Sequence, residues 1–101
     1  MIDLHCHSTA SDGHLAPAEV VKHAARVGLS AMALTDHDTL DGLVEATAAG
    51  AELGVRVVGG CEFSVAATWG EMHLLGYFLE PGDRDIEHFL VSARTDRSRR
   101  A

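Results

Sequence analysis

The sequence predicts an α/β fold in which short apolar strands alternate with helices around a parallel sheet or barrel. Apolar segments at residues 1–5, 31–35 and 55–62 have the length of buried strands, and two stretches with helical character separate them. This alternation of strand and helix is typical of parallel sheets. In such folds the functional side chains gather at the carboxyl ends of the strands.

A polar loop and then a helix are expected after the first strand. Residues 8–15 are rich in Ser, Asp and Gly, a composition typical of loops. Pro17 suits the first turn of a helix, because the N–H that it lacks would have no partner there. Apolar residues follow at helical spacing up to Gly28, which is expected to end this helix.

A second helix is expected over residues 40–53, closed by Gly54. In the short loop before it, Asp36 or Asp38 is expected to cap the helix. The strand after this helix continues past two glycines to Glu62.

The last part of the chain is expected to form a hairpin and a helix. A turn near Gly70 would join the third strand to a fourth strand over 72–79. After Pro81 and Gly82 break the pattern, Asp83 or Asp85 is expected to cap a helix over about 86–94.

The composition indicates one small globular domain. The chain has 101 residues, is 47% hydrophobic and carries a formal net charge of −7, which argues against a nucleic-acid-binding surface. The charge is uneven. Twelve acidic and three basic residues give residues 1–83 a net charge of −9, and three acidic and five basic residues give residues 84–101 a net charge of +2.

The cysteines and the apolar runs indicate a cytoplasmic protein with no membrane contact. Cys6 and Cys61 are the only cysteines, so a disulfide framework is not expected. A protein of this kind is expected in a reducing compartment. No apolar run has the length needed to cross a bilayer, and the amino-terminal residues lack the basic and long apolar parts of a signal peptide.

The first candidate site lies at the end of the first predicted strand. His5 and His7 are two residues apart, so a strand would point both imidazoles to the same face. Asp12 follows in the loop and would bring a carboxylate to the same place. Asp12–Gly13 is also a common turn pair, and for Asp12 alone a turn would be the more ordinary interpretation.

Three further candidates follow the other predicted strands. His37 lies just after the second strand, and Glu62 ends the third, where a carboxylate is costly to bury without a charged partner such as a cation or an arginine. His73 lies within the fourth strand. A lone histidine within a strand is more often a core residue than a metal ligand. His73 is a ligand candidate only because the other candidates are present in the same chain.

The remaining histidines and the cysteines are not expected to bind metal. His23 is expected to face solvent, His88 lies in the last predicted helix, and His14 lies in the loop near the first candidates. Cys6 would point away from His5 and His7, and Cys61 is expected to pack in the core.

Six imidazole and carboxylate ligands without thiolate suit zinc, manganese or iron. They are too many for one tetrahedral zinc ion, so they indicate two or more metals sharing carboxylates. Such sites hydrolyse phosphate esters. The sequence has neither a phosphate-binding Gly-rich loop with lysine nor a Gly-x-Ser-x-Gly elbow, so nucleotide-driven transfer and serine hydrolysis are not supported.

These motifs closely resemble those of the PHP (polymerase and histidinol phosphatase) superfamily. In chain order they are DLHCHSTASDG at 3–13, LTDHDT at 34–39, GCE at 60–62 and MHLLGY at 72–77. The chain looks most like the stand-alone phosphoesterases of the superfamily, including the 3',5'-nucleoside bisphosphate phosphatases. The histidinol phosphatase and DNA polymerase branches fit less well.

The resemblance implies the amino-terminal part of a distorted (β/α)7 barrel at residues 1–82, followed by a helix and a basic polar tail at 83–101. It implies two or three divalent metal ions, Mn, Zn or Fe with Mg as a further choice, and a metal-bound hydroxide that attacks phosphorus. The implied metal ligands are His5, His7, Asp12, His37, Glu62 and His73. Of these, His37, Asp12 and Glu62 would be catalytic, and Glu62 would bridge the metals.

The implied substrate is a small phosphate ester, a nucleotide, with no stable nucleic-acid binding and no membrane partner. Family members are much longer, and their later strands supply more ligands and basic groups for phosphate. The chain is therefore expected to self-associate or to need a carboxyl-terminal half. The alternative function is a truncated, non-catalytic metal-binding module of the same fold.

Overall fold

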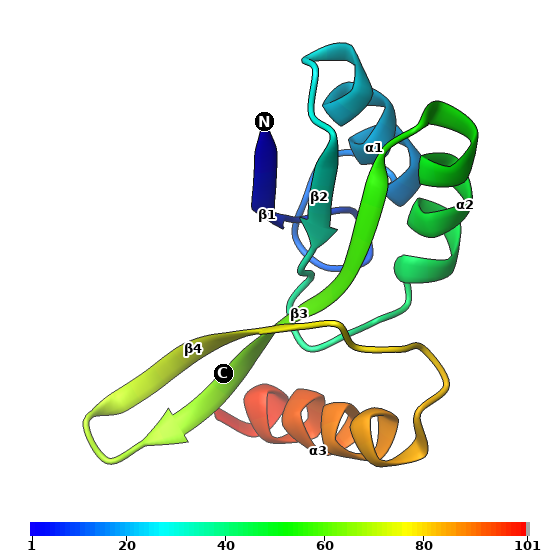
Figure 1. Cartoon of the computed structure of the whole chain (residues 1–101). Coiled ribbons are helices and arrows are strands. Elements are labelled where there is room, and N and C mark those ends of the chain that lie inside the picture. Colours follow the sequence, from blue (N-terminus) through cyan, green and yellow to red (C-terminus); the bar gives the residue numbers. More distant parts are fainter. Residues whose placement is uncertain (101) are drawn as a thin grey trace.

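The structure, a computed structural model, describes the backbone of residues 1–100 and the side chains of residues 1–95. Strands and helices alternate in its first half, and a hairpin and a long helix form its second half (Figure 1). The elements are β1 (Ile2–Cys6), α1 (Pro17–Arg26), β2 (Ala31–Leu34), α2 (Leu43–Leu53), β3 (Arg56–Ala67), β4 (Gly70–Tyr77) and α3 (Arg84–Arg100).

The four strands form one sheet in the order β1-β2-β3-β4. β1 pairs parallel with β2, and β2 pairs parallel with β3, whereas β3 and β4 form an antiparallel hairpin. The predicted alternation of parallel strands and helices is thus confirmed, as is the predicted turn near Gly70. The carboxyl ends of β1 and β2 lie at the same edge of the sheet, beside the middle of β3.

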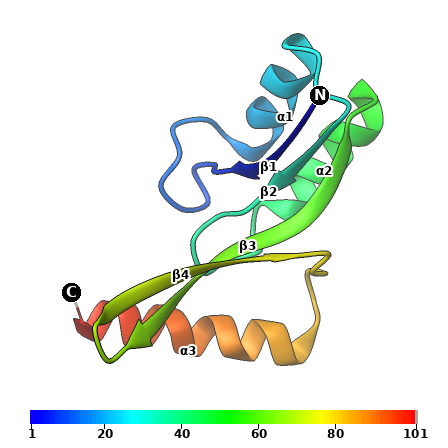
Figure 2. The ribbon, with the colours of Figure 1, turned by 60° about the vertical axis from the view of Figure 1, so that its left-hand side comes forward.

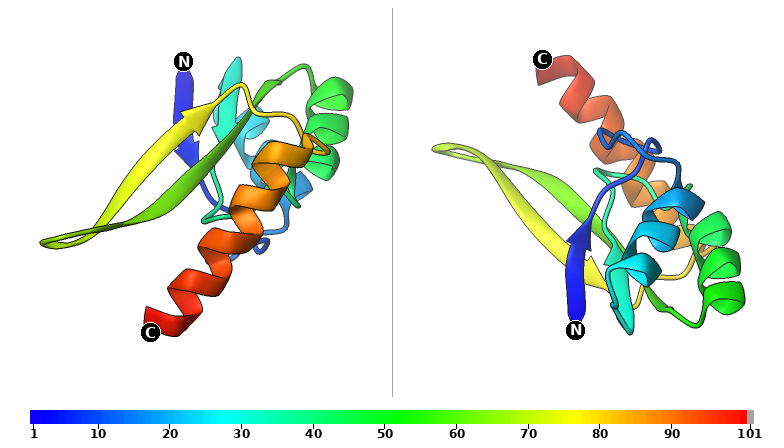
Figure 3. Two further views of the ribbon diagram at one scale, coloured as in Figure 1. Left: turned by 90° about the horizontal axis from the view of Figure 1, so that it is seen from below. Right: turned by 90° about the horizontal axis from the view of Figure 1, so that it is seen from above.

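The helices cover the sheet in two groups. α1 and α2 pack together on one face of the parallel strands, and α3 lies under the hairpin, obliquely to its strands (Figures 2 and 3). The core contains fully buried apolar side chains from both groups and from the sheet, among them Val21, Met32, Ala46 and Leu90. A single core therefore joins α3 to the rest of the molecule.

The long strand β3 changes partners along its length. Its first residues, as far as Gly59, pair with β2, and the segment from Gly60 onward pairs with β4. A Cβ on Gly60 would lie 2.8 Å from Cγ2 of Thr35 and 2.9 Å from the carbonyl oxygen of Gly76. Glycine is therefore needed where the strand passes from one neighbour to the other.

The expected cap of α2 was wrong. The helix begins at Leu43, with Gly42 at its amino-terminal cap position and no side-chain cap. The Asp36 carboxylate accepts hydrogen bonds from Ser8 and Ser11, and the Asp38 carboxylate accepts one from the Ser64 amide. Both side chains are directed into long-range contacts, away from the start of α2.

The cap of the last helix was predicted correctly. The Asp83 carboxylate accepts hydrogen bonds from the amides of Asp85 and Ile86, at 3.0 and 3.1 Å. α3 then continues to Arg100, beyond the end expected near residue 94. None of the helices in the described part of the chain has both the length and the apolar character required to span a membrane.

Candidate metal centre

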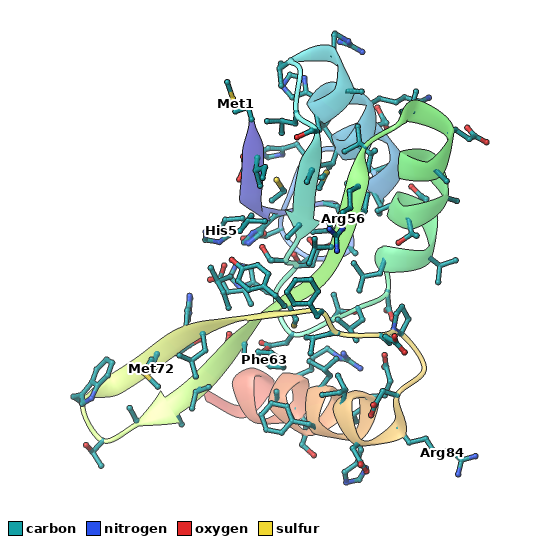
Figure 4. The ribbon with its side chains drawn as sticks, in the orientation of Figure 1. Met1, His5, Arg56, Phe63, Met72 and Arg84 are labelled. Atoms are coloured by element: carbon teal, nitrogen blue, oxygen red, sulfur yellow. The ribbon has the colours of Figure 1, made fainter. Side chains whose placement is uncertain are left out.

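His5 in β1 and His7 just after β1 point to the same carboxylate oxygen. Nε2 of His5 lies 2.6 Å from Oε1 of Glu62, and Nε2 of His7 lies 3.0 Å from the same atom. Figure 4 shows His5 at the lower end of β1, on the side that faces the hairpin. Both imidazoles thus lie at one place, as the sequence predicted, although β1 ends at Cys6, before His7.

The loop after β1 carries Asp12 back to these histidines. Oδ1 of Asp12 accepts a hydrogen bond from Nδ1 of His7 at 2.8 Å, and its Oδ2 lies 3.2 Å from Nε2 of His37. The loop packs so tightly that a Cβ on Gly13 would lie 2.7 Å from the carbonyl group of His7. The Asp12–Gly13 pair thus serves both the turn and the cluster.

Asp36 ties this loop to the end of β2. Its carboxylate is buried, with 2% of the residue exposed, and accepts three hydrogen bonds. The donors are the Ser8 amide at 2.6 Å, the Ser8 hydroxyl at 2.7 Å and the Ser11 hydroxyl at 2.7 Å. The Asp36 side chain therefore fixes the segment between His7 and Asp12.

His37 occupies the strand-like link that runs beside β3. It forms an isolated parallel bridge with Glu62, in which the Glu62 amide donates to the carbonyl of Asp36 and the Asp38 amide donates to the carbonyl of Glu62. The His37 side chain is only 10% exposed. Its Nδ1 is buried without a hydrogen-bond partner and lies 3.6 Å from Oε2 of Glu62.

Glu62 lies at the centre of the cluster. Its side chain is 8% exposed, and imidazoles from four histidines surround its two oxygens. Burial alone would raise the pKa of Glu62, but hydrogen bonds from His5 and His7 and the charge of His37 outweigh burial and lower the pKa. The sequence left open whether a cation or an arginine would pair with this carboxylate. Within the described residues no arginine does, and histidines surround the carboxylate instead.

His73 approaches Glu62 from the hairpin. Its Nδ1 lies 2.8 Å from Oε2 of Glu62, and its Nε2 lies 3.1 Å from Oε1 of Glu71. The sequence interpretation missed Glu71, although its position two residues before His73 on one strand places both side chains on the same face. A carboxylate on the outer nitrogen of a metal-binding imidazole is common in metalloproteins.

All six predicted ligands come together. They form three overlapping groups of three, within each of which the ligand atoms lie within 4.8 Å of one another. The groups are His5, His7 and Glu62; His7, Asp12 and His37; and His37, Glu62 and His73. Each group shares at least one residue with another, which is the arrangement expected where neighbouring cations share ligands.

The other candidates lie outside these groups in the part of the chain that is described. His14, His23 and His88 are exposed. Cys61 is fully buried in the core, and Cys6 packs against the core. Burial raises the pKa of Cys6 to about 11 and that of Cys61 to about 12, so both thiols are protonated at neutral pH and neither offers a thiolate ligand.

The residues fit divalent metal ions. The ligand atoms are imidazole nitrogens and carboxylate oxygens, a set that suits zinc, manganese and iron. Nδ1 of His37 is buried and has no hydrogen-bond partner, although buried polar atoms are normally satisfied. A cation between His37 and Glu62 would satisfy this nitrogen.

Comparison with known proteins identifies the family. The sequence matches the PHP domain over residues 3–97. The chain belongs to the PHP domain family. The fold agrees with this assignment. A Bifidobacterium adolescentis structure described as a candidate metal-dependent phosphoesterase superposes with a TM-score of 0.89 at 34% identity. The superposition covers 98% of this chain and 35% of that one. This PHP chain thus has the fold of part of a PHP barrel, as the sequence predicted.

Two curated relatives have related names. A 3',5'-nucleoside bisphosphate phosphatase from Chromobacterium violaceum is 43% identical over 99% of this chain and 35% of its own length. A 5'-3' exoribonuclease from Haemophilus influenzae is 39% identical over 98% of this chain and 36% of its own length. This PHP chain therefore spans about a third of the length of the curated relatives that it matches.

Proposed function

We propose that this PHP chain carries the metal-binding part of a phosphoesterase that hydrolyses a small phosphate ester, with a nucleotide as the substrate class. The observation that carries the proposal is the convergence of four imidazoles on one carboxylate, that of Glu62. The name of the Chromobacterium violaceum relative supports a nucleoside bisphosphate as the first substrate to test.

Two or three divalent ions, Mn, Zn or Fe with Mg as a further choice, would be held by the six clustered side chains. The proposed ligands are His5, His7, Asp12, His37, Glu62 and His73. When bound, such ions activate water as a nucleophile and neutralise charge on the phosphoryl oxygens. Glu62 is the proposed bridging ligand, because both of its oxygens face imidazoles from different strands.

Two carboxylates of the cluster, those of Asp12 and Glu62, are ionised in the metal-free protein. The pKa of Asp12 is lowered, because the hydrogen bond from His7 and the charges of His37 and His7 outweigh the opposing effect of burial. Glu62 has a lowered pKa for the same kind of reason, so both carboxylates are anionic at neutral pH. Asp12 is also 61% exposed, so a substrate could approach the cluster from its side. Asp12, His37 and Glu62 are the proposed catalytic residues.

A non-catalytic metal-binding module is the second candidate function. The observation that favours it is the lack of cationic partners: among the described side chains, no lysine or arginine bonds to any of the six ligand side chains. Phosphate binding normally uses such cationic groups.

All six ligands lie within residues 1–82, which we propose as the ligand-bearing part, with 83–101 as a helix and basic tail. The two free cysteines support a reducing, cytoplasmic compartment.

The test is release of inorganic phosphate from a nucleoside 3',5'-bisphosphate with added Mn²⁺, run beside the His37→Ala variant. Phosphate release by the native chain and not by the variant supports the phosphoesterase function. The same assay after size-exclusion chromatography tells whether active material is monomeric or self-associated. Metal binding without release in either protein would favour the non-catalytic module.

A further inference from the structure

Within the described residues, a side chain of the long helix α3 bonds to a loop of the candidate metal centre. Nη1 of Arg94 donates a hydrogen bond of 2.7 Å to the backbone carbonyl oxygen of Asp38, 56 residues earlier in the chain. The bond is charge-assisted, which makes it stronger than an ordinary amide contact. None of the six proposed ligands lies on α3, so this contact ties the helix to one of the ligand-bearing loops.

The residue that Arg94 holds has an unusual backbone. Asp38 has φ of 52°, in the left-handed region that non-glycine residues seldom adopt, and it is 1% exposed. Its amide donates to the Glu62 carbonyl at 3.1 Å, and its carboxylate accepts from the Ser64 amide at 2.9 Å. Such a conformation persists only where the surroundings stabilise it. Arg94 contributes to this by its hydrogen bond to the Asp38 carbonyl.

The conformation of Asp38 sets the position of the preceding residue, His37. The His37 ring has its two nitrogens on different carboxylates, with Nε2 3.2 Å from Asp12 and Nδ1 3.6 Å from Glu62. It also belongs to two of the three ligand groups. A change in the backbone at Asp38 would therefore move a side chain that both groups share, and metal sites tolerate displacements of only about 0.5 Å.

We infer that Arg94 is a positioning residue of the proposed metal centre: its guanidinium fixes the Asp38 carbonyl and thereby the direction of the His37 ring. This inference rests on the proposed function, in which the clustered side chains bind metal ions. Arg94 would touch neither metal nor substrate, and its effect would pass through the backbone of the loop.

The helix has anchors that do not depend on Arg94. Leu90 is fully buried in the core, and the Phe89 ring packs against Phe63 with 5.6 Å between centroids. A variant at Arg94 is therefore expected to keep α3 in place. Arg84, an exposed arginine at the start of the same helix, provides a matched control, since it has the same charge and no bond to the loops.

The experiment compares the Arg94→Ala, Arg94→Lys and Arg84→Ala variants of the whole chain by two measurements. Calorimetric titration with Mn²⁺ gives the metal affinity. Amide hydrogen exchange in the metal-free proteins gives the protection of the Asp38 amide. We expect Arg94→Ala to lower Mn²⁺ affinity by about 10-fold, the smaller effect typical of residues behind the ligands, and to speed exchange at Asp38. Arg84→Ala should change neither quantity.

Conservative rescue separates positioning from a general structural role. Lysine at position 94 retains a cationic donor, so Arg94→Lys should recover part of the affinity, and millimolar guanidinium should do the same for Arg94→Ala. Native affinity and native Asp38 exchange in Arg94→Ala would overturn the inference, as would equal losses in Arg84→Ala or no recovery by lysine and guanidinium. If the native chain bound no Mn²⁺, the proposed function would fail, and exchange at Asp38 would still decide the role of Arg94.

Discussion

The hydroxyl of Tyr77 on β4 donates a hydrogen bond of 2.8 Å to the carbonyl oxygen of Leu4 on β1, although 73 residues separate them. These strands are at opposite ends of the strand order, so the contact directly joins the first and last strands of the sheet. Leu4 directly precedes His5, and Tyr77 lies on the strand that carries His73. The bond therefore sets the separation between the first and last ligand-bearing strands.

Replacing Tyr77 by Phe tests this relationship with the loss of one hydroxyl. The free energy of unfolding should fall by about 1 kcal/mol, the net value of one hydrogen bond. Metal affinity should fall as well, because His5 and His73 would no longer be held at a fixed separation. Chemical denaturation and calorimetric titration check the two effects. An unchanged metal affinity would mean that Glu62 alone sets the distance between β1 and β4.

Asp36→Asn should damage the centre without removing any ligand. An amide offers one acceptor oxygen where the carboxylate offers two, so one of the donors from Ser8 or Ser11 would lose its partner. The free energy of unfolding should fall by about 2 kcal/mol, and metal affinity by about 10- to 100-fold. The exposed Asp41 is the control, because Asp41→Asn should leave both quantities unchanged. Equal stability of the two variants by thermal denaturation would refute the role given to Asp36.

The metal-free chain should lose stability as the solution becomes acidic. Folding lowers the pKa of Glu62 below its ordinary value of 4.5, so the ionised carboxylate stabilises the folded state. This stabilisation is complete above pH 4.5 and is lost as the pH falls through the folded-state pKa. Asp12 contributes in the same direction below its ordinary value of 3.8.

Urea denaturation in the presence of a chelator measures this dependence. The free energy of unfolding should fall as the pH is lowered below about 4.5, and Glu62→Gln should show a shallower fall. The same slope in both proteins would mean that other carboxyl groups dominate the acid response.

The two thiols should react slowly in the native protein. Burial raises the pKa of Cys6 to about 11 and that of Cys61 to about 12, so little thiolate is present at pH 8. Labelling with iodoacetamide should be slow in buffer and much faster in denaturant, where the ordinary value of 9.0 applies. Rapid native labelling of Cys61, which is fully buried, would contradict the packing of β3.

Residue spacing and strand order were sufficient to predict that several of the candidate ligands lie together. The spacing of His5 and His7 fixed their common face, and the order of the strands brought Glu62 and His37 to the same edge. These predictions succeeded because they depend on local geometry and on the rules of parallel sheets.

The contacts that hold the ligands were not predictable in the same way. Asp36 and Asp38 have the local signature of helix caps, but tertiary hydrogen bonds to Ser8 and Ser64 use their carboxylates instead. The bond from Arg94 to Asp38 joins positions 56 residues apart and has no local signal at all. Such long-range partners are determined by tertiary packing, which short sequence patterns do not encode.

The number of bound metal ions tests the central claim most directly. The claim is that Glu62 is a ligand shared between neighbouring cations. Elemental analysis of the native chain after equilibration with Mn²⁺ and removal of free metal should find at least two ions per chain, consistent with three overlapping ligand groups. Glu62→Gln should retain at most one. One ion or none in the native chain, or an unchanged content in Glu62→Gln, would contradict a shared centre built around this carboxylate.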